Sequence, residues 1–182
     1  MNFIETKLKG CFIIEPKVFG DKRGYFLESF NYQKFSEAIG YDVRFIQDNQ
    51  SYSSYGVLRG LHLQTGEDAQ AKLVRVLYGK VLDVVVDVRP GSETYGHHVA
   101  VELSHENKRQ LFVPRGFAHG FVVLSETAEF FYKVDNYYAP QSESGLLFND
   151  PELKIDWGVD EESLIIAPKD LEQPLLQNFT GQ

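Results

Sequence analysis

The sequence predicts an all-β domain of the sandwich, barrel or jelly-roll type. Many short apolar runs are separated by Gly, Asn, Asp or Pro, the chain holds 14 Phe and 10 Tyr, and helical patterns are few. Short strands at regular spacing with little helix are typical of these architectures. The chain has neither a G-x-G-x-x-G nor a G-x-x-x-x-G-K-[ST] pattern, which argues against a Rossmann dehydrogenase and a P-loop kinase.

Taken along the chain, the first clear element is a helix over residues 32–39, which begins near Asn31 and stops at Gly40. The clearest strand is 80–89, where Val84, Val86 and Val88 recur with a period of two and therefore share one face. Runs of similar character predict further strands at residues 72–78, 98–103, 110–113, 120–124 and 129–136. A second, short helix is expected around residues 168–171.

Length and charge indicate one domain with an acidic end. The 182 residues fit a single domain. The formal net charge is −8, but residues 150–182 hold eight acids and two bases, so the rest of the chain is nearly balanced. An acidic chain is a poor candidate for binding nucleic-acid polymers or anionic membranes. One small anionic ligand remains possible where cations cluster.

The chain carries no sign of secretion or membrane insertion. Cys11 is the only cysteine, so no internal disulfide can form. Residues 1–10 contain scattered charges and no long apolar run, and no stretch approaches the ~20 apolar residues of a membrane span. We therefore expect a cytoplasmic protein.

Two of the five histidines lie in segments of unusual character. His62 follows Arg59 and Gly60 in the apolar, strand-like run 58–64, and His119 lies in 114–121 beside Gly120. The other three, His97, His98 and His105, fall in or beside polar turns and are expected at the surface. A single histidine on a strand is more often a packed core residue than a catalyst, but two in similar settings favour a site.

These two segments resemble the motifs of the cupin jelly rolls. Residues 114–119 match the pattern P-x-G-x-x-H of the second cupin motif, and His62 matches a histidine of the first. Gln64 and Lys72, however, stand where the first motif has a second histidine and a glutamate. A metal site needs about three His or carboxylate ligands, and Lys72 would repel a cation. We therefore expect a metal-free pocket, in which a neutral histidine acts as base and a lysine stabilises an oxyanion.

A closer resemblance covers nearly the whole chain. Segments 19–30, 47–51, 58–64, 115–121, 132–133, 136–140, 149–151 and 169–170 are together similar to those of the dTDP-4-dehydrorhamnose 3,5-epimerase family. The resemblance implies a cupin-type jelly roll with a few short peripheral helices, one domain over residues 1–182, and a homodimer. It also implies an isomerase of dTDP-rhamnose and O-antigen biosynthesis, which acts on a dTDP-4-keto-6-deoxy-sugar and needs no cofactor or metal.

The resemblance also implies catalytic roles. His62 would remove the proton next to the C4 ketone, and Asp170 would hold its ring and support its charged form. Lys72 would stabilise the enolate oxygen, and Tyr132 would return a proton from the opposite face. Asp170 lies in the acidic segment 150–182, so we expect part of that segment to fold back onto the barrel.

Binding residues follow from the same resemblance. Cations for the diphosphate would come from Arg23, Arg59 and Lys169, since guanidinium groups suit phosphate oxygens. Tyr138 would stack on thymine, and His119 would neighbour the sugar or phosphate. The remaining polar contacts would come from Glu28, Gln47, Asp48, Asn49 and Glu143, with Asp48 contributing backbone. Arg23 and Glu28 would reach the partner's site in the dimer.

The spacing of Arg59 and His62 poses a local difficulty. Residues three apart on an ideal strand point to opposite faces. Gly60 lies between them and permits a bulge or twist, so the motif predicts a backbone irregularity there. At Leu63 the family often has an aromatic residue, and the change is expected to alter substrate packing at most.

Three other functions stay open at this point. A mono-epimerase or 3,4-ketoisomerase acting on a related dTDP-sugar would use the same histidine base. A cupin that binds a sugar nucleotide without catalysis would show binding but no proton exchange. A metal-dependent dioxygenase would require bound iron despite Gln64 and Lys72.

Overall fold

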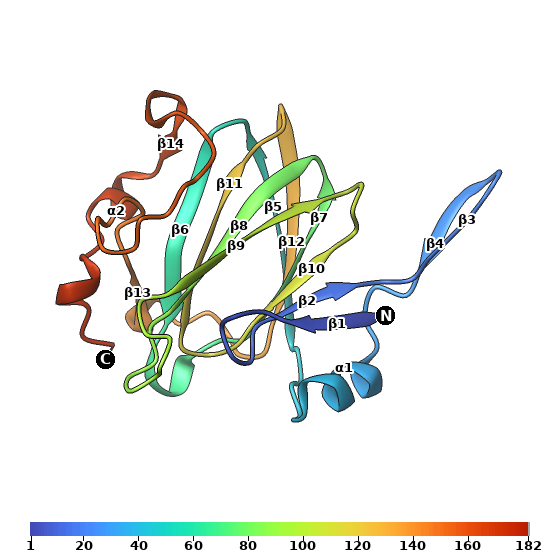
Figure 1. Cartoon of the computed structure of the whole chain (residues 1–182), viewed down its shortest axis with the longest axis horizontal. Coiled ribbons are helices and arrows are strands. Elements are labelled where there is room, and N and C mark those ends of the chain that lie inside the picture. Colours follow the sequence, from blue (N-terminus) through green and yellow to red (C-terminus); the bar gives the residue numbers. More distant parts are fainter. Residues whose placement is uncertain (182) are drawn as a thin grey trace.

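The computed structural model describes residues 1–181 and consists mainly of two sheets that face each other (Figure 1). The first sheet has the order β1 (Asn2–Glu5), β2 (Phe12–Glu15), β10 (Gln110–Val113), β7 (Lys72–Tyr78), β12 (Thr127–Val134) and β5 (Gln47–Ser54). The second has the order β13 (Glu143–Gly145), β6 (Val57–Gln64), β11 (Phe117–Val123), β8 (Lys80–Asp87) and β9 (His98–Ser104). Neighbouring strands within both orders are antiparallel. The predicted all-β jelly roll is confirmed.

The helices are short and peripheral, as expected. Helix α1 (Tyr32–Ile39) has the predicted bounds: Asn31 Oδ1 accepts the Lys34 amide at 3.1 Å, and Gly40 ends the helix with a φ of 85°. The predicted second helix is α2 (Pro168–Leu171). Four 3₁₀ turns complete the helical structure of the described residues, at Gly66–Asp68, Pro140–Ser142, Glu161–Ser163 and Leu176–Asn178.

The predicted strands 72–78, 80–89, 98–103, 110–113, 120–124 and 129–136 are all present, with ends shifted by up to three residues. Strand β5 was not predicted, because its sequence QDNQSYSS lacks an apolar alternation. Of its less exposed positions, Ser51 lines the cavity described below, and Ser53 accepts hydrogen bonds from Arg59.

Strand β8 is buried on both faces. Val81 and Val85 belong to the core between the two sheets, whereas Val84 and Val86 belong to a second core on the outer face of the second sheet. The second core includes Trp157, in the C-terminal part of the chain. A third, smaller core lies under α1. The C-terminal segment thus covers the outer face of the second sheet, while the first sheet covers its inner face. Apolar side chains on both faces are therefore removed from water.

A strand pairing attaches the C-terminal segment to the second sheet, and hydrogen bonds within and next to the segment fix its path (Figure 1). Strand β14 (Ile165–Ile166) pairs in parallel with the start of β6. The buried carboxylate of Asp150 accepts the Leu176 amide at 2.6 Å, and the Trp157 indole donates to the Phe148 carbonyl at 3.0 Å. These contacts determine where α2 sits beside β6.

A hairpin of β3 (Val18–Asp21) and β4 (Gly24–Leu27) projects from the barrel on the side away from the C-terminal segment (Figure 1). Its aromatic side chains Phe19, Tyr25 and Phe26 are exposed by more than half. Within residues 1–181, no helix is long and apolar enough to cross a membrane.

Candidate active site

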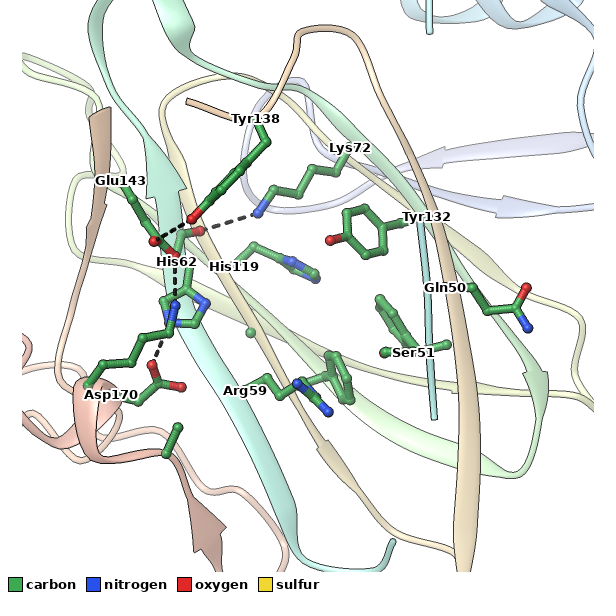
Figure 2. A pocket seen from close by; sticks show the side chains of 15 residues that line it. Gln50, Ser51, Arg59, His62, Lys72, His119, Tyr132, Tyr138, Glu143 and Asp170 are labelled. Atoms are coloured by element: carbon green, nitrogen blue, oxygen red, sulfur yellow. Dashed lines mark hydrogen bonds and ion pairs between the residues drawn. The ribbon is translucent and has the colours of Figure 1, made fainter. Parts of the chain in front are cut away.

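A cavity of about 330 Å³ opens between the two sheets and brings nine of the predicted site residues together (Figure 2). These nine are Arg59, His62, Lys72, His119, Tyr132, Tyr138, Glu143, Lys169 and Asp170. Residues not predicted for the site also line it, namely Gln50, Ser51, Gly120, Phe121, Phe130 and Ala167. The cavity therefore combines many polar side chains with the stacked rings of Phe121 and Phe130, one from each sheet.

A bulge in β6 directs both Arg59 and His62 into this cavity. Arg59 pairs with Phe121 and His62 pairs with His119, so three steps along β6 match two along β11. Gly60 has a φ of 134°, and a Cβ at Gly60 would lie 2.5 Å from the Gly120 Cα. Only glycine suits both that backbone conformation and the close approach of β11. The predicted irregularity is confirmed.

His62 and Asp170 form a hydrogen-bonded pair. The His62 Nε2 lies 2.7 Å from Asp170 Oδ1, and the second carboxylate oxygen accepts the Gly60 amide at 3.3 Å. Asp170 is almost fully buried, and α2 brings it to β6 from 108 residues away in the chain. Burial lowers the pKa of His62 below its ordinary value, although Asp170 opposes the shift. Nε2 being bound to Asp170, the neutral ring has Nδ1 available to accept a proton.

Lys72 supplies a cation deep in the same cavity. Its ammonium donates to the His62 carbonyl at 3.4 Å. Burial lowers the pKa of Lys72 to about 8, and the carboxylates of Asp83 and Glu143 oppose that shift. The lysine therefore remains mostly protonated at neutral pH and can stabilise a developing negative charge.

Tyr132 enters the cavity from the other sheet. It lies on β12, whereas His62 lies on β6, and Figure 2 shows both side chains directed into the space between the sheets. Burial raises the pKa of Tyr132, so the phenol keeps its proton. An acid and a base on opposite walls can act on opposite faces of one ring.

Three charged or aromatic side chains form a cluster at the rim of the cavity. Glu143 accepts hydrogen bonds from Lys169 Nζ at 3.0 Å and from the Tyr138 hydroxyl at 3.1 Å. Burial tends to raise the pKa of Glu143, but these two donors outweigh it and the pKa is lowered. The Tyr138 ring is 59% exposed, so one face is free to stack on a flat ligand.

His119 is paired with a carboxylate that the sequence analysis did not place in the site. Its Nε2 lies 2.9 and 3.0 Å from the two oxygens of Asp83, and Asp83 is fully buried. Asp83 shares a strand face with Val85, which points into the barrel. The only available signal was the position of an acid on the inward face of a strand that is otherwise rich in valine.

The structure leaves five predicted binding residues outside the lining of this cavity. Gln47 and Asn49 lie on β5 and bond to each other at 2.9 Å, and the neighbouring Asp48 pairs with Lys133. Arg23 is on the projecting hairpin, 83% exposed and paired with Asp21. Glu28 follows that hairpin and pairs with Lys34.

Leu63 does not affect substrate packing in the way the sequence suggested. Its side chain is buried in the core on the outer face of the second sheet. Successive residues of a strand point to opposite faces, so Leu63 faces away from the cavity that His62 lines.

Gln64, which stands at a cupin ligand position, has a different task. Its amide nitrogen donates to the carbonyls of Asp68 and Tyr137, at 2.6 and 3.1 Å, and its oxygen accepts the Ala139 amide at 2.9 Å. These three bonds hold the loop that carries Tyr138. In the described residues, no three or more His, Cys, Asp or Glu side chains form a group suited to a metal.

Comparisons with known proteins point to one family. The family model described as dTDP-4-dehydrorhamnose 3,5-epimerase matches residues 5–178. The curated enzyme of that name from Escherichia coli K12 is 55% identical over 93% of this chain and 91% of its own length. The one from Pseudomonas aeruginosa is 56% identical over 91% of each chain.

Solved structures agree. The dTDP-4-dehydrorhamnose 3,5-epimerase of Elizabethkingia anophelis NUHP1 superposes with a TM-score of 0.96 at 55% identity, covering 100% of this chain and 99% of that one. The dTDP-6-deoxy-D-glucose-3,5-epimerase of Legionella pneumophila, in complex with dTDP-4-keto-L-rhamnose, has a TM-score of 0.93 at 51% identity, with 97% and 93% coverage. A 3'-monoepimerase from Streptomyces bikiniensis is more distant, at 33% identity and a TM-score of 0.89, with 94% and 86% coverage.

Proposed function

The chain belongs to the dTDP-4-dehydrorhamnose 3,5-epimerase family, and on that premise we propose that it inverts C3 and C5 of dTDP-4-dehydro-6-deoxy-α-D-glucose. The product is dTDP-4-dehydro-β-L-rhamnose, and the activity is that of an isomerase in dTDP-rhamnose biosynthesis. The observation that carries the assignment of roles is the cavity in which His62 and Tyr132 approach from different sheets. Relatives at 50–56% identity are 3,5-epimerases, whereas a 3-epimerase among the relatives is 38% identical.

The first step is removal of a proton from a carbon next to the C4 ketone. His62 accepts it at Nδ1, and the negative charge moves to the C4 oxygen as an enolate. Asp170 stabilises the imidazolium that forms, and the Lys72 ammonium stabilises the enolate oxygen. A contact of the latter kind contributes roughly 3–4 kcal/mol to the transition state.

The second step delivers a proton to the same carbon from the other face. Tyr132 donates it, which inverts the carbon, and exchange with solvent then restores both His62 and Tyr132. A base alone would return the proton to the face it came from and mostly regenerate substrate. Inversion at the second carbon repeats the two steps on the other side of the ketone.

Nucleotide recognition uses the rim and the walls of the cavity. Arg59 and Lys169 bind the diphosphate, and His119 contacts the sugar or phosphate. Tyr138 stacks on thymine, an assignment supported by its exposed ring. The remaining polar contacts come from Glu143 at the rim and, beyond the cavity lining, from Gln47, Asn49 and the backbone at Asp48.

We propose that residues 1–182 act as one domain, with part of 150–182 folded onto the barrel, and that two chains form a homodimer. The hairpin β3–β4 supports the dimer, because it projects from the barrel with exposed aromatic side chains. In the dimer, Arg23 and Glu28 contact the substrate bound by the partner. We also propose a cytoplasmic location, which agrees with the unpaired Cys11.

Deuterium exchange tests the proposed reaction. Purified protein in D₂O is expected to incorporate deuterium at both C3 and C5 of the authentic 4-keto sugar nucleotide. Incorporation at one carbon would indicate a mono-epimerase instead, and none at either carbon would contradict the proposed function. Calorimetric binding of the nucleotide without exchange would identify a non-catalytic binding protein.

Two variants assign the roles. His62→Ala is expected to abolish exchange at both carbons, a loss of at least about 100-fold. Tyr132→Phe is expected to keep exchange at the first carbon while reducing net inversion, since only the returning proton is lost. Tyr52→Phe, at an exposed tyrosine on β5 outside the cavity, is the matched control and should behave like the wild type.

A further inference from the structure

His119, which lines the cavity, forms a second histidine–carboxylate pair with Asp83. The reaction described above gives Asp83 no role. Asp83 lies behind His119 and does not line the cavity. Both of its oxygens are within 3.0 Å of the same ring nitrogen, and neither residue is more than 7% exposed. Burying an isolated carboxylate costs free energy. Charges or hydrogen-bond donors around Asp83 therefore have to offset that cost.

The two pairs are connected in the same way. In each, Nε2 faces the carboxylate, and the two histidines are direct partners across β6 and β11. Within residues 1–181 the His119 Nδ1 has no hydrogen bond, yet it is not among the buried unpaired atoms. It is therefore open to the cavity. The packing of the His119 ring near Phe130, 6.3 Å between centroids, further restricts its orientation.

The surroundings of Asp83 link it to Lys72. Burial raises the pKa of Asp83, while His119 on β11 and Lys72 on β7 oppose that shift and favour the charged carboxylate. The Asp83 charge also helps to raise the pKa of the buried Cys11 thiol. The carboxylates of Asp83 and Glu143 favour a higher pKa for Lys72. The charge of Lys72 in turn favours a lower pKa for His62. Of the two carboxylates, Asp83 has the larger effect on the pKa of Lys72, and it is buried away from solvent.

We propose that Asp83 is a positioning residue of the catalytic centre. It holds His119 in the Nε2–H tautomer, so that Nδ1 faces the substrate, and its negative charge keeps the buried ammonium of Lys72 protonated for stabilisation of the enolate. This inference rests on the proposed epimerase function. It assigns to Asp83 an action through His119 and Lys72 and no contact with the substrate.

Asp83→Asn separates the two actions, because an amide oxygen can still accept a hydrogen bond from His119 Nε2–H while the charge is lost. Burial lowers the pKa of Lys72 to about 8, and removal of Asp83's charge is expected to lower it further. The alkaline limb of kcat should therefore move to lower pH by about one unit or more. At pH 8 kcat should fall about fivefold or more, with partial recovery at lower pH and a KM changed by less than about threefold.

Asp87→Asn is the matched control. Asp87 lies on the same strand and is fully buried, but its carboxylate serves Arg89, Ser92 and Thr94 outside the cavity. Its variant should unfold more easily without moving the alkaline limb. If the alkaline limb of the pH profile and the kcat of Asp83→Asn equal those of the wild type, the inference is overturned.

Two further measurements, NMR of His119 and deuterium exchange by the wild type, complete the test. If Asp83→Asn does not fold, ¹⁵N NMR of the wild type reports the tautomer, and a His119 that carries its proton only on Nδ1 would refute the inference. If the wild-type protein exchanges no deuterium, the proposed function is refuted. If the wild type exchanges normally and the alkaline limb of Asp83→Asn does not move, only the role of Asp83 is refuted.

Discussion

Burial holds His62 and Tyr132 in the protonation states that their roles require. It lowers the pKa of the imidazole, which favours the neutral base, and raises the pKa of the phenol, which favours the acid. Lys72 is the exception, since burial favours its neutral form and two carboxylates have to oppose that tendency. The site therefore depends on a balance of desolvation and charge at a single lysine.

This balance predicts the pH dependence of activity. His62 has to be neutral, and its pKa is below the ordinary 6.5, so kcat/KM should stay high at pH 6.5 and fall only at lower pH as His62 becomes protonated. Lys72 has to be charged, so activity should decline as pH rises through about 8. A pH profile of kcat/KM measures both limbs. An acidic limb above pH 6.5 would contradict the role of His62 as the free base.

At the scale of elements, the bulge in β6 determines which of its side chains face the cavity. Without it, Arg59 and His62 would lie on opposite faces, and the proposed phosphate contact and the proposed base could not share one cavity. The same strand carries Gln64, which holds the Tyr138 loop, and it pairs with β13, which carries Glu143. One strand thus positions the base and two parts of the rim.

Gly60→Ala tests the bulge. The new Cβ would lie 2.5 Å from the Gly120 Cα and 3.0 Å from the His119 carbonyl oxygen, so β6 and β11 have to separate. We expect a loss of about 1–3 kcal/mol in the free energy of unfolding, together with a large fall in exchange at C3 and C5. Urea unfolding and the exchange assay measure the two effects.

Gly24→Ala provides the control for this variant. Gly24 has nearly the same positive φ, 132°, but nothing lies within 4 Å of a Cβ at that position. The difference between the two variants isolates the contact with β11 from the backbone cost that they share. Equal stability of the two would show that the close approach of Gly60 and Gly120 is unimportant.

At the scale of the whole molecule, the cavity is assembled from both sheets and from the C-terminal segment, while Arg23 and Glu28 lie on or beside a hairpin directed away from it. A single chain therefore keeps two of the proposed substrate contacts outside its own cavity. A homodimer with contacts in both directions would supply them, because twofold symmetry makes the two sites equivalent.

Mixed dimers test this arrangement. If Arg23 acts on the partner's site, a dimer of one Arg23→Ala chain and one His62→Ala chain has one complete site, with His62 and Arg23 from different chains. Co-expression at equal amounts is then expected to restore about one quarter of wild-type activity, since half of the dimers are mixed and each has one working site. Light scattering should report the mass of a dimer. No restoration would show that Arg23 acts within its own chain, whereas full activity of the Arg23→Ala homodimer would show that Arg23 has no role.

Local sequence pattern was enough to predict the all-β class, helix 32–39 with its caps, the strands with clear apolar runs, and the irregularity at Gly60. Motif resemblance added the family and the candidate residues of the cavity. The tertiary structure alone decided that the polar strand β5 lines a wall, that Leu63 faces outward, and that Asp83 lies behind His119. It also determined the direction of each pKa shift. The physical reason is that burial and charge pairing depend on which surface covers each face of a strand, and those surfaces come from segments as far apart as His62 and Asp170.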